Sequence, residues 1–515
     1  MKMKRIFYKI LSLMMSFVLL LSALYLNAYA SQDEVIYGVL RNGVVSDYKY
    51  SDEYFSRDSY TYFSDLALIS LHFAMSVMYN PNGARRSIPH QRVPEAGIEF
   101  LHNLGYDTVI DYGYRNRCTI DGIACTIGQK NIDKNDETII ALGIRGSDYD
   151  WEWGGNFKIG TGIEHEGFSK AKDETLKCLA DFIKLRKDTF NSDVKLWITG
   201  YSRSAAAGNL LAAAIDNNSV DAGYDFEAKN VYAYVFEAPG SSRADDAKGE
   251  AYGNIFNVVN PIDIVPRFVP KQWGYSRYGK DILLPSLENN EDYDILRSKM
   301  EKEYKSISNM TYYENFCFYQ PKSFNDVLYS IINSSSGKAL DPFKVNESIG
   351  QGAFLDGLIE MLANEVIKSP QNYEDNYQNF LVKLLSAVIT NNSNLVFTFD
   401  VNELLSDLFS FCQTNIVNLF LHPMKFSDSL RRLLAEYLTE NLNVKNIYYP
   451  EGITSEEYYD LLGEVDDFLF AFLRHPDYAY TTYKYLTNKS PDGDLACFIP
   501  HYQEVELAWM RALDE

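Results

Sequence analysis

The sequence predicts an α/β fold, a mostly parallel sheet flanked by helices, that is interrupted by a large all-helical insertion. Before about residue 285, apolar patterns typical of strands alternate with patterns typical of helices, and this alternation indicates βαβ units. From residue 285 to 485 the pattern is helical. A small-residue pentapeptide around a serine, residues 200–204, stands between an expected strand and an expected helix. With 515 residues, 46% of them hydrophobic, the chain is long enough for one large domain or two.

The expected elements follow in chain order. Residues 66–77 form an apolar stripe of helical period, and a second helix over residues 94–104 is ended by Gly105. Further helices are expected around residues 176–183 and over residues 204–215, and strands over residues 123–127, 138–144, 194–199, 231–236 and 255–259. Five amphipathic stripes, beginning near residues 354, 377, 401, 430 and 454, make up the insertion. A strand-like run at residues 495–499 and a terminal helix with Val505 and Trp509 complete the pattern.

The first 30 residues have the features of a secretory signal peptide. An apolar run over residues 10–26 ends in Ala28-Tyr29-Ala30, and basic residues precede it at Lys2, Lys4, Arg5 and Lys9. The small-x-small end predicts cleavage after Ala30 and a secreted protein that begins at Ser31. An uncleaved membrane anchor is the alternative, since the run approaches the length of a membrane span.

Charge and cysteine usage exclude some classes of protein. A net charge of -22 repels phosphate backbones and disfavours nucleic acid as a partner. The six cysteines have neither metal-site nor dense disulfide spacing, and they lie at Cys118, Cys125, Cys178, Cys317, Cys412 and Cys497. Cys118 and Cys125 are candidates for a disulfide across a hairpin. Cys178 and Cys412 lie on apolar helix faces, which favours buried thiols for both.

The chemistry is concentrated at Gly200-Tyr201-Ser202-Arg203-Ser204. The strand expected at residues 194–199 precedes this pentapeptide and the small-residue helix 204–215 follows it. A serine at such a sharp strand-to-helix turn is held in a strained conformation, and its neighbours two positions away must be small. The helix also directs its first N–H groups at the site, where an oxyanion would be stabilised. Ser204 replaces the last glycine of G-x-S-x-G, and the alternative interpretation is a serine-rich helix cap without catalysis.

In this setting the sequence resembles the class 3, or fungal-lipase-like, family of the α/β-hydrolase superfamily. Similar blocks occur in the family's order at residues 144–147 with Asp150, Trp151 and Asn156, at 165–168, at 236–240 and at 260–266. The resemblance covers about residues 100–270 and a short C-terminal piece around residues 501–509, and it leaves the insertion unexplained. Together with the change to a helical pattern near residue 285, it predicts an α/β-hydrolase domain over residues 31–284, a helical cap or lid over residues 285–485 and a return to the hydrolase domain at residues 486–515.

The resemblance implies a catalytic triad of Ser202, Asp263 and His501. Asp263 follows an expected strand and would orient the imidazole; Asp245 and Asp246 are weaker candidates in a polar loop. The chain order Ser, Asp, His leaves three histidines, His422, His475 and His501. The first two precede prolines at the ends of insertion helices, so His501 is preferred.

The remaining site residues also follow from the resemblance. Ser147 and the N–H of Arg203 would form the oxyanion hole. His165 is interpreted as structural. We interpret Asp148, Asp150 and Glu152 as a solvated acidic loop rather than a metal site, and no cofactor is expected.

These residues predict hydrolysis of carboxylic esters through an acyl-enzyme, with a lipid or small ester as substrate and a transient lipid interface as a further partner. An amidase or thioesterase with the same triad is one alternative, because fold and triad do not fix the leaving group. A hydrolase-like binding protein without activity is the other. The insertion helices either cover the site or bury one another. Oligomeric state is left open.

Overall fold

The computed structural model describes residues 34–39, 45–78, 95–114, 119, 121–147, 150–313, 350–373, 410, 421, 485, 490–491 and 496–514. The predicted signal peptide therefore lies outside the described residues. So do Cys118, Cys317, Cys412 and, apart from single positions, the insertion stripes that begin near residues 377, 401, 430 and 454.

Within the described part of the chain, seven strands form one sheet in the order in which they occur along the sequence. The first two neighbouring pairs are antiparallel and the next four are parallel. The predicted α/β fold with a mostly parallel sheet is therefore confirmed. The strands are β3 Thr108–Tyr112, β4 Cys125–Ile132, β5 Glu137–Ile144, β6 Asp193–Tyr201, β7 Val231–Phe236, β8 Ile255–Val259 and β9 Lys280–Leu283. Separately, β1 Glu34–Val39 pairs with β2 Val45–Tyr50 as an antiparallel hairpin.

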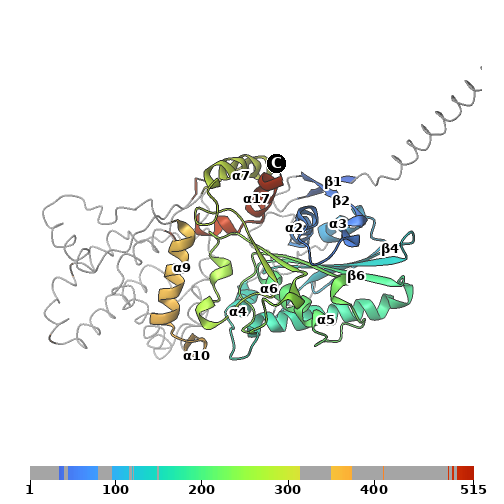
Figure 1. Cartoon of the computed structure of the whole chain (residues 1–515), viewed down its shortest axis with the longest axis horizontal. Helices are drawn as coiled ribbons and strands as arrows, with labels where there is room; N and C mark the ends of the chain where they lie inside the picture. The colour runs from blue at the N-terminus through green and yellow to red at the C-terminus, as the bar shows by residue number, and fades with distance from the viewer. Residues whose placement is uncertain are drawn as a thin grey trace, which may run out of the picture.

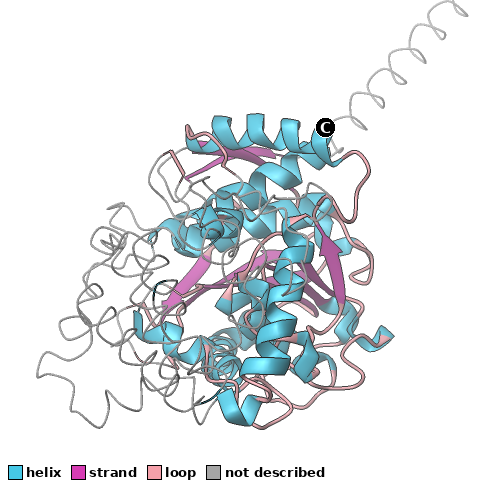
Figure 2. Ribbon diagram, turned by 90° about the vertical axis from the view of Figure 1, so that its left-hand side faces the viewer, coloured by secondary structure: helices cyan, strands magenta, loops and turns pink. Residues whose placement is uncertain are grey.

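Helices cover both faces of the sheet, because the inner strands carry apolar side chains on both faces (Figures 1 and 2). In β6, Trp197 belongs to one core cluster and its neighbours Leu196 and Ile198 belong to the other. The first face is covered by α2 Ser64–Met78, α3 Glu95–Asn103, α7 Tyr293–Ser308 and α17 Gln503–Asp514. On the second face lie α4 Asp150–Asn156, α5 Glu166–Arg186 and α6 Arg203–Asp216.

Helix α2 is fixed to the sheet by hydrogen bonds as well as by apolar contacts. The indole N–H of Trp197 donates to Ser70 Oγ (2.8 Å), and the Thr199 hydroxyl donates to the Ser70 carbonyl (2.9 Å). Most residues of α2 are buried around its whole circumference, since β2, α3 and α17 pack against it in addition to the sheet. The core on this face therefore depends on the C-terminal helix.

The first helix after residue 285 packs on this same core. In α7, Tyr293, Met300 and Tyr304 join the cluster that includes Trp509 of α17, and the rings of Tyr293 and Trp509 stack with centroids 5.9 Å apart. Helix α9 Gln351–Met361, a π-helical turn Leu362–Val366 and the short α10 Pro370–Asn372 follow. The domain boundaries at residues 285 and 485 stay predictions.

The prediction of a strand-like run at residues 495–499 is wrong, because the structure has a 3₁₀ helix there, η9 Ala496–His501. An apolar run of five residues does not distinguish the two by period, and Pro500 lacks the N–H that a strand ladder needs. The side chains of this turn enter the clusters around Trp509 and Phe354. Among the described helices, none combines the length and apolarity needed to cross a membrane.

Candidate active site

Ser202 lies at the turn between β6 and α6. Its φ of 62° and ψ of −125° are strained for a residue with a side chain, and its N–H donates to the Phe236 carbonyl on β7 (2.9 Å). A Cβ at Gly200 would lie 2.8 Å from the backbone of Ser204. Strand and helix therefore approach as closely as the predicted nucleophile elbow requires.

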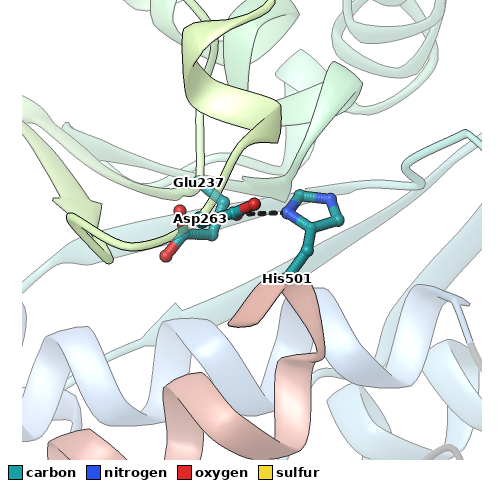
Figure 3. A group of neighbouring side chains, drawn as sticks. All are labelled: Glu237, Asp263 and His501. Carbon is teal, nitrogen blue, oxygen red and sulfur yellow. Dashed lines mark hydrogen bonds and ion pairs between the residues drawn. The ribbon is translucent and has the colours of Figure 1, made fainter. Parts of the chain in front are cut away.

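The structure brings together the three residues predicted as the triad. His501 Nε2 lies 3.0 Å from Ser202 Oγ. On the other side of the ring, His501 Nδ1 lies 2.5 Å from Asp263 Oδ2, the contact drawn as a dashed line in Figure 3. Asp263 is fully buried and Ser202 is 6% exposed. The imidazole thus joins a hydroxyl on one ring nitrogen to a carboxylate on the other, which is the arrangement that activates a serine.

Further hydrogen bonds position Asp263 and His501 next to each other, although the two residues are far apart in the chain. Asp263 Oδ1 accepts from the N–H of Val265 (2.9 Å), so the other oxygen is left for the histidine. The Asn260 amide donates to the Pro500 carbonyl (3.2 Å), which connects the loop after β8 to η9. The Tyr201 hydroxyl donates to the carbonyl of His501 (3.2 Å).

The candidate oxyanion residues lie at the neighbouring strand end. A Cβ at Gly146 would lie 2.7 Å from the Tyr201 carbonyl, so the segment after β5 runs directly against the elbow and places Ser147 beside it. The Asn156 amide donates to Ser147 Oγ (3.1 Å) and orients this hydroxyl. Arg203 is the first residue of α6, at the helix end whose dipole favours a negative charge.

The side chains around this loop correct the prediction of a solvated acidic loop. Glu152 is 2% exposed and forms a bidentate ion pair with Arg145, with a closest distance of 2.6 Å. The guanidinium of Arg203 is also buried and donates to the Gly122 carbonyl (2.5 Å). Glu152 is therefore a structural ion-pair partner. Asp148 and the side chain of Asp150 lie outside the described residues.

The other histidines and acids considered as candidates are not described at the site. His165 is fully buried and caps α5, where Nδ1 accepts from the N–H of Phe168 (3.4 Å); burial lowers its pKa to about 3. Asp245 and Asp246 are exposed. His422 and His475 lie outside the described residues.

Two buried acids beside the triad were not predicted. Glu237 follows β7 and Glu506 lies in α17. Both are fully buried, and Glu237 Oε2 and both carboxyl oxygens of Glu506 have no hydrogen-bond partner among the described residues. Burial raises the pKa of Glu506 to about 7, and burial together with the neighbouring acids raises the pKa of Glu237 well above its usual range. The signal that could have revealed Glu237 is a charged residue directly after an apolar strand of a parallel sheet.

Among the described residues, one group of His, Cys, Asp and Glu side chains lies close enough to hold a metal ion: Glu237, Asp263 and His501, whose ligand atoms lie within 4.8 Å of one another. The direct bond between His501 Nδ1 and Asp263 occupies the atoms that would have to turn toward a metal. The group is better described as a hydrogen-bonded network.

Fold and site together define the class of protein: a lipase-type serine hydrolase with an α/β-hydrolase-like fold. Residues 137–273 match the family model described as lipase (class 3), and the resemblance to that family is confirmed over this segment. The chain is an enzyme of the serine carboxylic ester hydrolase class. The comparison with curated proteins finds no match.

Solved structures similar to the chain include several fungal lipases. The triacylglyceride lipase of Rhizomucor miehei is 16% identical, over 44% of this chain and 80% of that one, with a TM-score of 0.29. Lipase II from Rhizopus niveus is 14% identical, over 45% and 80% of the two chains, with a TM-score of 0.31. A lipase from Rhizopus microsporus var. chinensis is 16% identical, over 43% and 75%, with a TM-score of 0.30.

Proposed function

We propose that the chain is an exported lipase or esterase that cleaves carboxylic esters, lipid esters in particular, with Ser202, His501 and Asp263 as its triad. The observation that carries the proposal is the pair of contacts at His501, 3.0 Å to the Ser202 hydroxyl and 2.5 Å to the Asp263 carboxylate. The family match adds the substrate class, since it is to lipases.

The reaction follows from these contacts. Ser202 Oγ attacks the ester carbonyl while His501 Nε2 accepts the serine proton, and Asp263 stabilises the imidazolium through Nδ1. The imidazolium then donates its proton to the leaving alcohol, and Ser202 remains acylated. Water, deprotonated by the same imidazole, attacks the acyl-enzyme, and Ser202 regains its proton as the acid leaves.

Two backbone N–H groups, those of Ser147 and Arg203, would bind the oxyanion of each tetrahedral intermediate. The positions of the two residues support this assignment, because Gly146 lies against Tyr201 and Arg203 is the first residue of α6. One such donor contributes about a hundredfold to a thousandfold in rate.

The described part of the predicted insertion lies beside the site. Gln351 of α9 donates to the Ile262 carbonyl (3.0 Å), directly before the triad acid, and Asp356 pairs with Arg267 (3.1 Å). This contact supports an insertion that stands at the mouth of the site, where a lipid-facing cap would act.

Covalent labelling with a fluorophosphonate probe tests the nucleophile. The unaltered protein should be labelled, whereas Ser202→Ala and His501→Ala should not. Ser192→Ala and His102→Ala, which alter exposed residues, should label normally. A folded, unaltered protein that does not react with the probe would favour a binding protein without activity.

Substrate class and export need separate measurements. A chain-length series of p-nitrophenyl esters, run beside matched amides and thioesters, should show faster ester cleavage and a preference for long acyl chains; faster amide cleavage would favour an amidase. Export predicts that the protein recovered from culture medium begins at Ser31, and an N-terminus at Met1 on membrane-bound protein would contradict it.

A further inference from the structure

Glu237 lies directly behind the nucleophile turn. Its N–H donates to the Val258 carbonyl (2.9 Å), and the preceding carbonyl, that of Phe236, accepts the N–H of Ser202 (2.9 Å). The backbone of Glu237 has a φ of 53°, the left-handed region that favours glycine. A large side chain held in this conformation, fully buried, indicates that its carboxyl group has a function that a glycine would not supply.

The carboxyl group of Glu237 lies in a buried cluster of acids beside the proposed triad. Oε1 accepts from the N–H of Asn260 (2.7 Å). The other oxygen, Oε2, is buried without a hydrogen-bond partner among the described residues, as are both carboxyl oxygens of Glu506, and a carboxyl oxygen of Glu237 lies within 4.8 Å of one of Asp263. Figure 3 shows Glu237 beside Asp263, which in turn reaches His501. The four side chains come from four parts of the chain: the ends of β7 and β8, η9 and α17.

Neighbouring buried carboxyl groups that lack other donors can satisfy one another only if one of them carries a proton, because an ionised carboxylate only accepts. Asp263 Oδ2 lies 2.5 Å from His501 Nδ1, and its proposed role of stabilising the imidazolium requires a negative charge. Burial, followed by the charges of Glu506 and Asp263, raises the pKa of Glu237 well above its usual range, and that of Glu506 rises only to about 7. The proton therefore belongs on Glu237.

We propose that Glu237 is a neutral carboxylic acid that donates a hydrogen bond to Asp263 and thereby positions the acid of the triad. The inference rests on the triad proposed above and adds to it a positioning residue that does not touch substrate. A neutral donor holds the carboxylate in place without repelling it, whereas an ionised Glu237 would place a second negative charge against Asp263.

Two substitutions separate the hydrogen bond from the backbone. Glu237→Gln keeps the shape, stays neutral and retains an N–H donor, so kcat should stay within about threefold of the unaltered protein. Glu237→Gly suits the positive φ but removes the donor, so kcat should fall about tenfold to a hundredfold with KM unchanged. The split between kcat and KM distinguishes loss of positioning from loss of substrate binding.

Asp136→Gly is the matched control, because it also replaces an acid by glycine at a positive φ (55°) but in an exposed turn between β4 and β5. Its kcat and KM should equal those of the unaltered protein. Equal kcat values for Glu237→Gly and Glu237→Gln would overturn the positioning role, whether both variants are as fast as the unaltered protein or both are slow.

The protonation state has a readout that does not depend on activity. In an infrared difference spectrum of unaltered protein minus Glu237→Gln, recorded above the usual pKa of carboxyl groups, the C=O stretch of a protonated acid should appear. A carboxylate band in its place would overturn the proposal. If Ser202→Ala and the unaltered protein prove equally inactive on esters, the proposed function fails while this spectrum still decides the state of Glu237.

Discussion

Ser204 stands where G-x-S-x-G has its second glycine, and its side chain completes the turn. The hydroxyl accepts from the N–H of Tyr201 and donates to the Tyr201 carbonyl, both at 2.9 Å. These two bonds satisfy polar groups of the strained turn that would otherwise be buried without partners. The departure from the motif is thus compatible with an intact nucleophile elbow.

Asn156 should affect catalysis through Ser147. Removing its amide in Asn156→Ala frees the Ser147 hydroxyl, which loses the 3.1 Å bond that orients it, so kcat on a p-nitrophenyl ester should fall about tenfold, less than for loss of an oxyanion donor itself. Asn135→Ala, which removes an exposed amide bonded to Glu137, serves as the control and should leave kcat unchanged. An unchanged kcat in Asn156→Ala would show that the Ser147 side chain is dispensable.

Single residues could be predicted where a local pattern fixes their setting. Ser202 and Asp263 each follow an apolar strand, and the structure places both where the pattern puts them. Glu152 was misjudged because its burial depends on Arg145, which lies on another element. Glu237 was not predicted for the same reason. The carboxyl groups near it come from α17 and from the loop after β8, and the sequence around Glu237 gives no sign of them.

At the scale of elements, the turn between β6 and α6 should be intolerant of bulk. In Gly200→Ala the new Cβ would lie 2.8 Å from backbone atoms of Ser204, so the free energy of unfolding should fall by about 1–3 kcal/mol. Gly162→Ala is the matched control, because its nearest contact is an ordinary 3.6 Å. Urea denaturation measures both, and equal midpoints for the two variants would contradict the close approach.

Cys125 of β4 and Cys178 of α5 should form a disulfide under oxidising conditions. Both thiols are free. The neighbouring Cys125 lowers the pKa of the Cys178 thiol, while Cys178 and burial raise the pKa of the Cys125 thiol well above its usual range. The Cys178 thiolate should therefore attack oxidised glutathione first and Cys125 should then displace glutathione, giving a disulfide that stabilises the fold by about 2–4 kcal/mol.

Peptide mapping without reductant measures this pairing, and Cys178→Ser should remove it. A disulfide between Cys118 and Cys125, the pairing predicted from sequence, would contradict the expected one. Cys497→Ser provides the control, since that thiol is buried against Phe354 and Tyr485 in another cluster.

Elements were predicted best where the chain alternates regularly. The strands at residues 231–236 and 255–259 have the predicted bounds, because a short all-apolar run between polar turns is typical of a buried parallel strand. The edge strands β3 and β9 were not predicted; they are only partly buried or exposed, so they carry a weaker apolar signal. The turn at residues 496–501 depends on packing that no local period encodes.

For the molecule as a whole, buried acids should make stability depend on pH. Burial raises the pKa of Asp216 from 3.8 to about 7, so the folded state keeps a proton that the unfolded chain loses earlier. Its contribution to stability is present below 3.8 and is lost as the pH rises through about 7. Asp216→Asn should therefore be more stable than the unaltered protein above this range, with a weaker pH dependence.

Urea midpoints at a series of pH values measure this effect. Asp133→Asn, which alters an exposed acid, should show the same pH dependence as the unaltered protein. A steeper dependence in Asp216→Asn than in the unaltered protein would contradict the assigned direction of the pKa shift.

The three reacting groups come from very different points along the chain, and His501 comes last, in the same segment as α17. During synthesis the sheet, Ser202 and Asp263 all emerge well before His501, and α17 then has to pack between α2 and α7 before the imidazole reaches the hydroxyl. A growing chain in which residue 501 has not yet been made therefore holds the proposed nucleophile without the proposed base. The order of translation thus separates synthesis of the proposed nucleophile from its activation, because the proposed triad can form only after η9 and α17 have been made and have packed onto the sheet.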